Sequence, residues 1–84
     1  MAFALSIVTP QGLAYEGDAE SIVLPGSEGD FGVLPNHERF LTPLREGEVE
    51  IRTASETLNA TIASGFADVT GTEVTVLVDS CEFV

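Results

Sequence analysis

The segment Glu48–Arg52 reads EVEIR, and its five residues alternate between charged and apolar side chains. Val49 and Ile51 fall on one face of an extended chain, and the charged residues fall on the other, because successive side chains of a β-strand point to opposite sides. The same period of two recurs in Leu58–Ile62, where apolar residues alternate with asparagine and threonine. This pattern is typical of half-buried strands and not of helices.

Alternation with a period of two extends along the whole chain. Further runs of this kind begin at Phe3, Ile22 and Val74, and they are rich in the valine, isoleucine and threonine that strands favour. Turn-forming residues separate the runs, for example at Pro10–Gly12. No segment carries an amphipathic helical stripe. The pattern predicts one all-β domain over residues 1–84, either an antiparallel sandwich or a barrel.

Length and charge restrict the functions that this domain can have. The chain has 84 residues, a hydrophobic fraction of 44% and a net charge of −11. A domain of this size has little room for an internal catalytic cavity. Its negative charge should repel nucleic acid and anionic membrane surfaces, so we expect a basic partner and no nucleic acid.

The sequence predicts a soluble, cytoplasmic protein that reaches a membrane only through a complex. No apolar run approaches the roughly 18 residues of a membrane helix, and the N-terminus lacks the basic start of a signal peptide. Cys81 is the only cysteine, so an internal disulfide is impossible and we expect a structural thiol.

The stretch Leu24–His37 reads LPGSEGDFGVLPNH and has three glycines at a spacing of three. A phosphate-binding loop needs backbone amides in front of a helix, often with a lysine. The chain contains no lysine, no helical pattern follows, and Glu28 and Asp30 would place negative charge beside the phosphates. We therefore expect this stretch to bind no nucleotide.

Metal binding and catalysis are also poorly supported in this stretch. Asp30, His37 and Glu38 follow no recognised metal-ligand spacing, and Ser27 does not lie in a nucleophile elbow. Composition alone does not exclude hydrolysis by a pair of carboxylates, because a chain with fourteen acidic residues always includes close pairs. With no tryptophan and one tyrosine, however, the chain offers little to stack on a sugar. We predict no cofactor, no metal and no enzymatic activity.

The shape of this stretch is better suited to recognition by another protein. Its glycines permit unusual backbone angles, and the prolines at its two ends fix φ. Phe31 and Val33 alternate with Asp30 and Gly32, which predicts a short extended piece with one apolar and one polar face. A segment constrained in this way presents Glu28 and Asp30 at defined positions.

Four motifs in this order and spacing resemble the epsilon subunits of rotary ATP synthases, whose mitochondrial counterpart is called delta. They are LPGSEGDFGVLPNH, LTPLREGEVEI, SGFADV and VTVLVDS, and the similarity extends from about Phe3 to Ser80. The resemblance implies a ten-stranded antiparallel β-sandwich. It also implies a non-catalytic rotor subunit that couples the gamma shaft to the membrane c ring, peripheral on the cytoplasmic face of the bacterial inner membrane.

The resemblance also assigns contact residues. Four consecutive residues match the family segment that faces the loops of the c ring: Glu28, Gly29, Asp30 and Phe31. Two residues match positions on the side that meets the gamma subunit: His37 and Thr42. Asp30 occupies the position of an acid that the family uses in the ring contact.

The chain departs from the family pattern in three ways, one of which is Ser64-Gly65 in place of a common Gly-Gly pair before the aromatic residue. Asn36–Arg39 replaces a common Gly-His-Ala-Pro, which changes the neighbourhood of the expected gamma contact. Family members also commonly continue into two C-terminal helices that inhibit ATP hydrolysis, whereas this sequence stops at Val84. We therefore expect coupling without helix-mediated inhibition.

The charges of the chain are distributed unevenly. All three basic residues lie between Arg39 and Arg52, and residues 1–37 contain five acids and no base. Such a layout speeds and orients docking on a basic surface. The alternative is a free-standing β-sandwich that binds a sugar or a peptide, for which we would expect an exposed aromatic platform.

Overall fold

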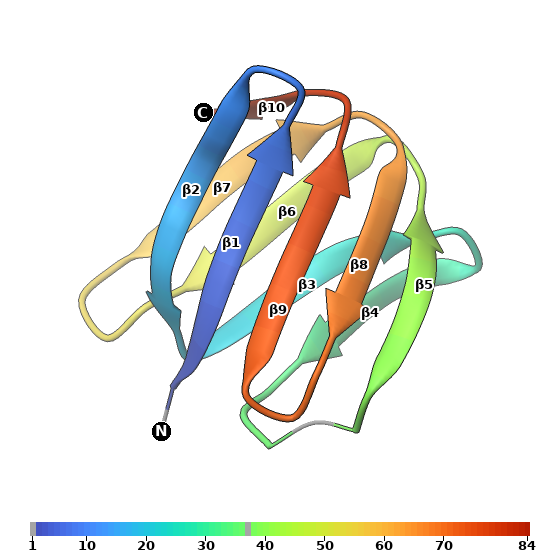
Figure 1. Ribbon diagram of the computed structural model, residues 1–84. Helices are drawn as coiled ribbons and strands as arrows, with labels where there is room; N and C mark the ends of the chain where they lie inside the picture. Colours follow the sequence, from blue (N-terminus) through green and yellow to red (C-terminus); the bar gives the residue numbers. More distant parts are fainter. Residues whose placement is uncertain (1, 37) are drawn as a thin grey trace.

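The computed structural model describes residues 2–36 and 38–84, which form ten strands and, over these ranges, no helix (Figure 1). The strands are β1 Phe3–Thr9, β2 Gly12–Ala19, β3 Ser21–Gly26, β4 Gly29–Val33, β5 Phe40–Leu44, β6 Gly47–Arg52, β7 Thr57–Ile62, β8 Gly65–Val69, β9 Glu73–Val78 and β10 Cys81–Phe83. The predicted all-β class and the ten strands are confirmed.

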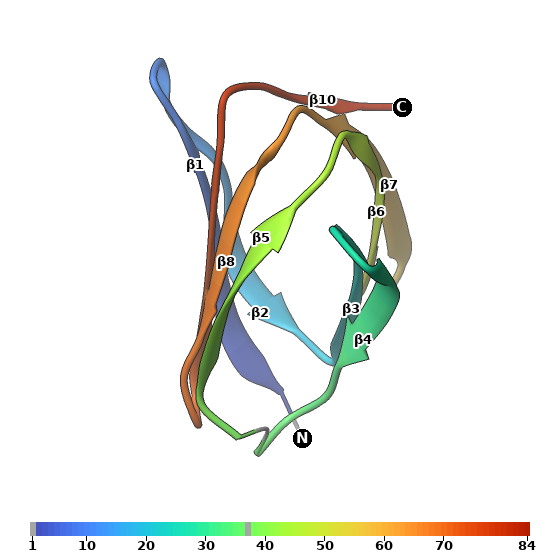
Figure 2. The same cartoon turned by 90° about the vertical axis from the view of Figure 1, so that its right-hand side faces the viewer.

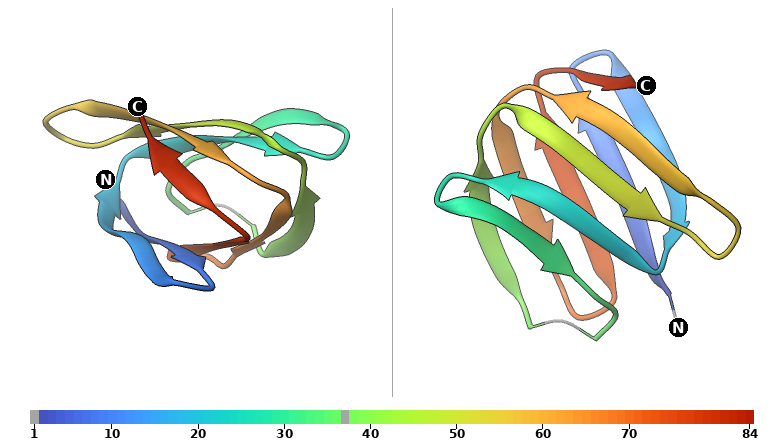
Figure 3. Two further views of the ribbon diagram at one scale, coloured as in Figure 1. Left: turned by 90° about the horizontal axis from the view of Figure 1, so that it is seen from above. Right: turned by 180° about the vertical axis from the view of Figure 1, so that it is seen from behind.

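The strands form two facing layers (Figure 2). The first layer has the order β5-β8-β9-β1-β2, and the second has the order β10-β7-β6-β3, with β4 paired to β3 at its edge. The layers join at one corner, where Gly26 of β3 pairs with Leu44 of β5. At one end of the sandwich β10 crosses over from β9 to pair with β7 (Figure 3).

The predicted purely antiparallel arrangement is wrong at one pair. β1 and β9 run parallel, with Leu5 opposite Val74 and Ile7 opposite Val76. A parallel pair needs a long connection between its strands, and here the intervening strands provide it. Alternation along each strand shows which side chains face inward but does not encode the direction of a distant neighbour, so the sequence pattern missed this pair.

The core lies between the two layers and consists of the side chains that alternation placed inside. Val49, Ile51 and Val76 are fully buried, and the described residues include no buried polar or charged one. At the open edge, Tyr15 of β2 packs against Phe83 of β10 with ring centroids 6.0 Å apart. This aromatic contact closes the gap between the edge strands of the two layers.

Candidate functional site

The stretch Leu24–Val33 is a β-hairpin. Gly26 of β3 pairs with Gly29 of β4, which leaves Ser27 and Glu28 as a two-residue turn. The φ of Gly29 is +135°, an angle that L residues rarely adopt, so this position of the turn favours glycine.

The predicted short extended piece with two unlike faces is confirmed as β4. Val33 is buried and Phe31 is half-buried, whereas Asp30 is exposed. Phe31 also packs edge-on against Phe40 of β5, with ring centroids 5.8 Å apart. The apolar side of β4 is therefore anchored to the core, and its polar side is free to face a partner.

The tip of this hairpin is tied to the β5–β6 turn. A guanidinium nitrogen of Arg45 lies 2.7 Å from a carboxylate oxygen of Asp30. Two backbone hydrogen bonds join the same segments: the N–H of Arg45 donates to the Pro25 carbonyl at 2.9 Å, and the N–H of Ser27 donates to the Pro43 carbonyl at 3.2 Å. Sequence reasoning missed the partner of Asp30, because Arg45 is 15 residues away in the chain and only the pairing of β3 with β5 brings the two together.

Of the two residues expected to contact gamma, Thr42 lies beside the hairpin tip. It lines an open hollow of about 440 Å³ together with Pro43 and residues 26–31. His37 lies outside the described residues. The structure thus brings Thr42 together with the segment expected to contact the c ring.

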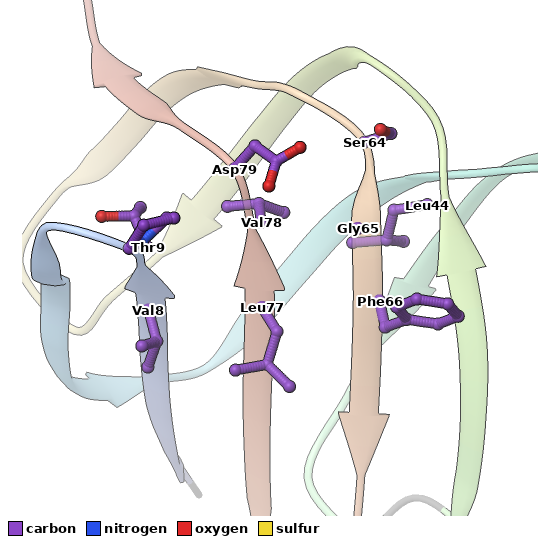
Figure 4. Close-up of a pocket in the computed structure, with 10 residues that line it drawn as sticks. Val8, Thr9, Leu44, Ser64, Gly65, Phe66, Leu77, Val78 and Asp79 are labelled. Carbon is purple, nitrogen blue, oxygen red and sulfur yellow. The ribbon is translucent and has the colours of Figure 1, made fainter.

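A row of apolar side chains crosses the outer surface of the first layer. Neighbouring strands place its members opposite one another, and we call this set the apolar row: Pro43, Phe66, Leu77, Val8 and Leu13. Leu13, Phe66 and Leu77 are 59%, 51% and 46% exposed. Figure 4 shows Val8, Leu77 and Phe66 on three neighbouring strands, beside an open hollow of about 600 Å³. Its members come from five strands, so no local sequence pattern reveals the row.

The outer surface of the second layer is acidic. We call it the acidic face, and its carboxylates are Asp30, Glu48, Glu50 and Glu82. Three of these residues are exposed, and the side chain of the fourth, Glu50, is 40% exposed. The exposed Val23 lies among the first three of them, beside a small hollow of about 200 Å³. Arg52 pairs with Glu50 at 3.2 Å, in the same way that Arg45 pairs with Asp30.

These surfaces are suited to contact more than to chemistry. Among residues 2–36 and 38–84, no three or more histidine, cysteine or acidic side chains are grouped so that they could hold a metal ion. Partial burial raises the pKa of the Cys81 thiol above its ordinary value of 9.0, which disfavours the reactive thiolate. In the same described ranges, no helix is long and apolar enough to span a membrane.

A small β-sandwich that carries an apolar row on one outer surface and an acidic face on the other has the features of a protein-binding domain. Residues 2–84 match the family described as the beta-sandwich domain of the ATP synthase delta/epsilon chain, and the chain belongs to this family. The resemblance seen in the four sequence motifs is thereby confirmed.

Relatives agree with this assignment. The ATP synthase epsilon chain of Helicobacter acinonychis is 44% identical over 80 residues, which cover 95% of this chain and 65% of the relative. The epsilon chain of Leptospira borgpetersenii is 39% identical over 75 residues, which cover 89% of this chain and 59% of the relative. The chain therefore spans about three-fifths of the length of these relatives.

Two solved structures share the fold. A chain in the mitochondrial ATP synthase of Euglena gracilis, solved with OSCP, F1 and the c-ring, superposes with a TM-score of 0.91 at 21% identity, covering 98% of this chain and 53% of that one. A chain in the central stalk/c-ring structure of the Tetrahymena thermophila enzyme gives a TM-score of 0.81 at 16% identity, covering 96% and 66%. At these identities the likeness establishes the sandwich fold.

Proposed function

We propose that this chain is a non-catalytic rotor subunit of ATP synthase, which couples the gamma shaft to the membrane c ring. Family membership and the names of the relatives support this role. The observation that carries it is the difference between the two outer surfaces, because a rigid domain that links two partners needs two distinct contact regions. The chain itself would then need neither a cofactor nor a catalytic group.

The apolar row is the proposed contact for gamma. Contiguous exposed apolar surface on a small domain commonly marks a protein interface. Phe66 lies near the middle of the row, and large aromatic side chains at such positions often carry much of the binding energy. Thr42 precedes Pro43 in β5 but pairs with the buried Ala67, so its side chain faces away from the row, and the row does not include the gamma contact that the resemblance implies for Thr42.

The hairpin tip is the proposed contact for the c ring. Glu28 is exposed in the turn, and Asp30 presents its carboxylate from the adjoining strand. Acidic side chains at this tip would orient the domain on a basic ring loop. Contact with the membrane would be indirect, through the complex, and the bacterial relatives support a place on the cytoplasmic face of the inner membrane.

The test is reconstitution of ATP synthase from which the resident epsilon chain has been removed. We expect the added chain to restore ATP synthesis driven by a proton gradient, since rotation of the ring would again reach the catalytic head. A chain that binds neither the depleted enzyme nor the isolated gamma subunit would contradict the proposal. That result would instead favour a free-standing binding module.

A further inference from the structure

We infer that Arg45 is a positioning residue for the c-ring contact, acting through Asp30. This inference rests on the proposed function, in which the hairpin tip meets the ring. The guanidinium of Arg45 bonds one oxygen of the Asp30 carboxylate at 2.7 Å and leaves the other oxygen available to a partner. Arg45 would thereby fix the direction in which Asp30 presents its charge.

The backbone around Arg45 makes it suitable for this role. Its own N–H donates to Pro25 at 2.9 Å, so the base of the side chain is fixed relative to β3. The second guanidinium nitrogen lies 3.4 Å from the Glu46 carbonyl, which restrains the other end of the side chain. Asp30, by contrast, directly follows Gly29, which has no side chain that could hold the Asp30 rotamer.

Charge and positioning predict opposite effects when Arg45 is removed. The loss of a positive charge makes the tip more acidic, which by charge alone would strengthen docking on a basic ring loop. The loss of the 2.7 Å bond frees the Asp30 side chain, and docking must then order it at an entropic cost. The sign of the change in affinity therefore separates the two effects.

Arg52 provides a matched control. It is an exposed arginine of the second layer that pairs with one carboxylate, Glu50, at 3.2 Å. Arg52→Ala removes the same charge and the same kind of ion pair as Arg45→Ala, but away from the hairpin tip. Because both pairs are exposed, we expect both variants to melt within a few degrees of the unmodified chain.

The experiment measures binding of the full chain to epsilon-depleted ATP synthase and, in parallel, to a head–shaft subcomplex that lacks the c ring. We expect Arg45→Ala to weaken binding about two- to fivefold only where the ring is present, and Arg52→Ala to leave it unchanged or slightly tighter. In an Asp30→Asn background, Arg45→Ala should cause no further loss of binding, since its partner carboxylate is already neutral and only the effect of the removed charge remains.

The outcomes separate the inference from the proposed function. If Asp30→Asn weakens ring-dependent binding but Arg45→Ala behaves like Arg52→Ala, the positioning role is wrong and the ring contact stands. The inference is also wrong if Arg45→Ala weakens ring-dependent binding by the same factor in the unmodified chain and in the Asp30→Asn background. If neither the ring nor Asp30 affects binding of the unmodified chain, the proposed ring contact itself is wrong.

Discussion

The two outer surfaces of the sandwich are built from the same kind of strand but differ in chemistry. In β8 and β9 the outward positions hold Phe66 and Leu77 as well as Asp68 and Thr75, whereas in β6 they hold only charged residues: Glu48, Glu50 and Arg52. Inward positions are apolar in both layers. The comparison shows that inward residues are constrained by the common core, while outward residues are free to specialise each surface for a different partner.

The largest expected effect comes from a change that disturbs the strand pairing beneath the apolar row. A Cβ atom on Gly65 would lie within 1.9 Å of the Leu77 carbonyl oxygen, closer than any real contact. Gly65→Ala should therefore force β8 and β9 apart and lower the free energy of unfolding by about 3 kcal/mol or more, as overpacking and a disrupted strand pair combine. Urea denaturation measures the change.

Gly71→Ala is the matched control for this prediction. A Cβ atom there meets nothing within 4 Å, and its φ lies outside the range that side chains avoid. We expect its unfolding free energy to change by less than about 0.5 kcal/mol. Equal stability of both variants would show that β8 and β9 do not approach as closely as described.

The next effect concerns the chemistry of the apolar row itself. Phe66→Asp places a charge at its middle and should weaken binding to gamma by about 2 kcal/mol or more, roughly thirtyfold, if this residue is central to the interface. The fold should persist, since Phe66 is 51% exposed. Titration of isolated gamma with the full chain, followed by fluorescence anisotropy, measures the affinity.

Val23→Asp introduces the same charge at an exposed apolar residue of the acidic face. It should leave the affinity for gamma nearly unchanged, because Val23 lies on the opposite outer surface. A loss as large as that of Phe66→Asp would mean that the two surfaces do not have separate partners.

A smaller effect is expected at the hairpin tip. Asp30→Lys replaces attraction to a basic ring loop with repulsion, and it also places a second cation beside Arg45. The free energy of binding to the ring-containing enzyme should therefore become less favourable by about 1–2 kcal/mol. Glu50→Lys reverses the same charge beside Arg52 but away from the tip. Binding to the ring-containing enzyme at low and physiological salt should distinguish them, with Asp30→Lys the weaker binder at both. Identical affinities would contradict the assignment of the tip.

The smallest effect is a pH dependence from Cys81, on the inner side of the acidic layer. Burial raises the pKa of its thiol in the folded chain, so the unfolded chain releases this proton first as the pH rises. Its contribution to stability is therefore constant below the unfolded pKa and decreases as the pH rises from there to the folded pKa. Between about pH 8 and about pH 10, the free energy of unfolding measured with urea should decrease slightly more for the unmodified chain than for Cys81→Ala. The same loss in both would indicate an unperturbed thiol.

Much of the fold was accessible from the sequence, because alternation is a local property of each strand. The period of two correctly placed Val49, Ile51 and Val76 in the core. The short extended piece at Phe31–Val33 was predicted from the same alternation and is part of β4, whereas its pairing with β3 as a hairpin was not predicted. The candidate ring-contact segment, Glu28–Phe31, comes from the family resemblance and stays a prediction.

Features assembled from distant strands depended on the tertiary structure. The parallel pairing of β1 with β9, the bond between Asp30 and Arg45, and the apolar row each join residues that are far apart in the sequence. Register between strands is set by how side chains pack across the core and by the geometry of the turns, and a shift of one residue would turn Phe66 and Leu77 inward. The sequence alone thus determined which strands form and which side each residue faces. Packing alone determined which outward residues meet, and so where a partner finds a continuous surface.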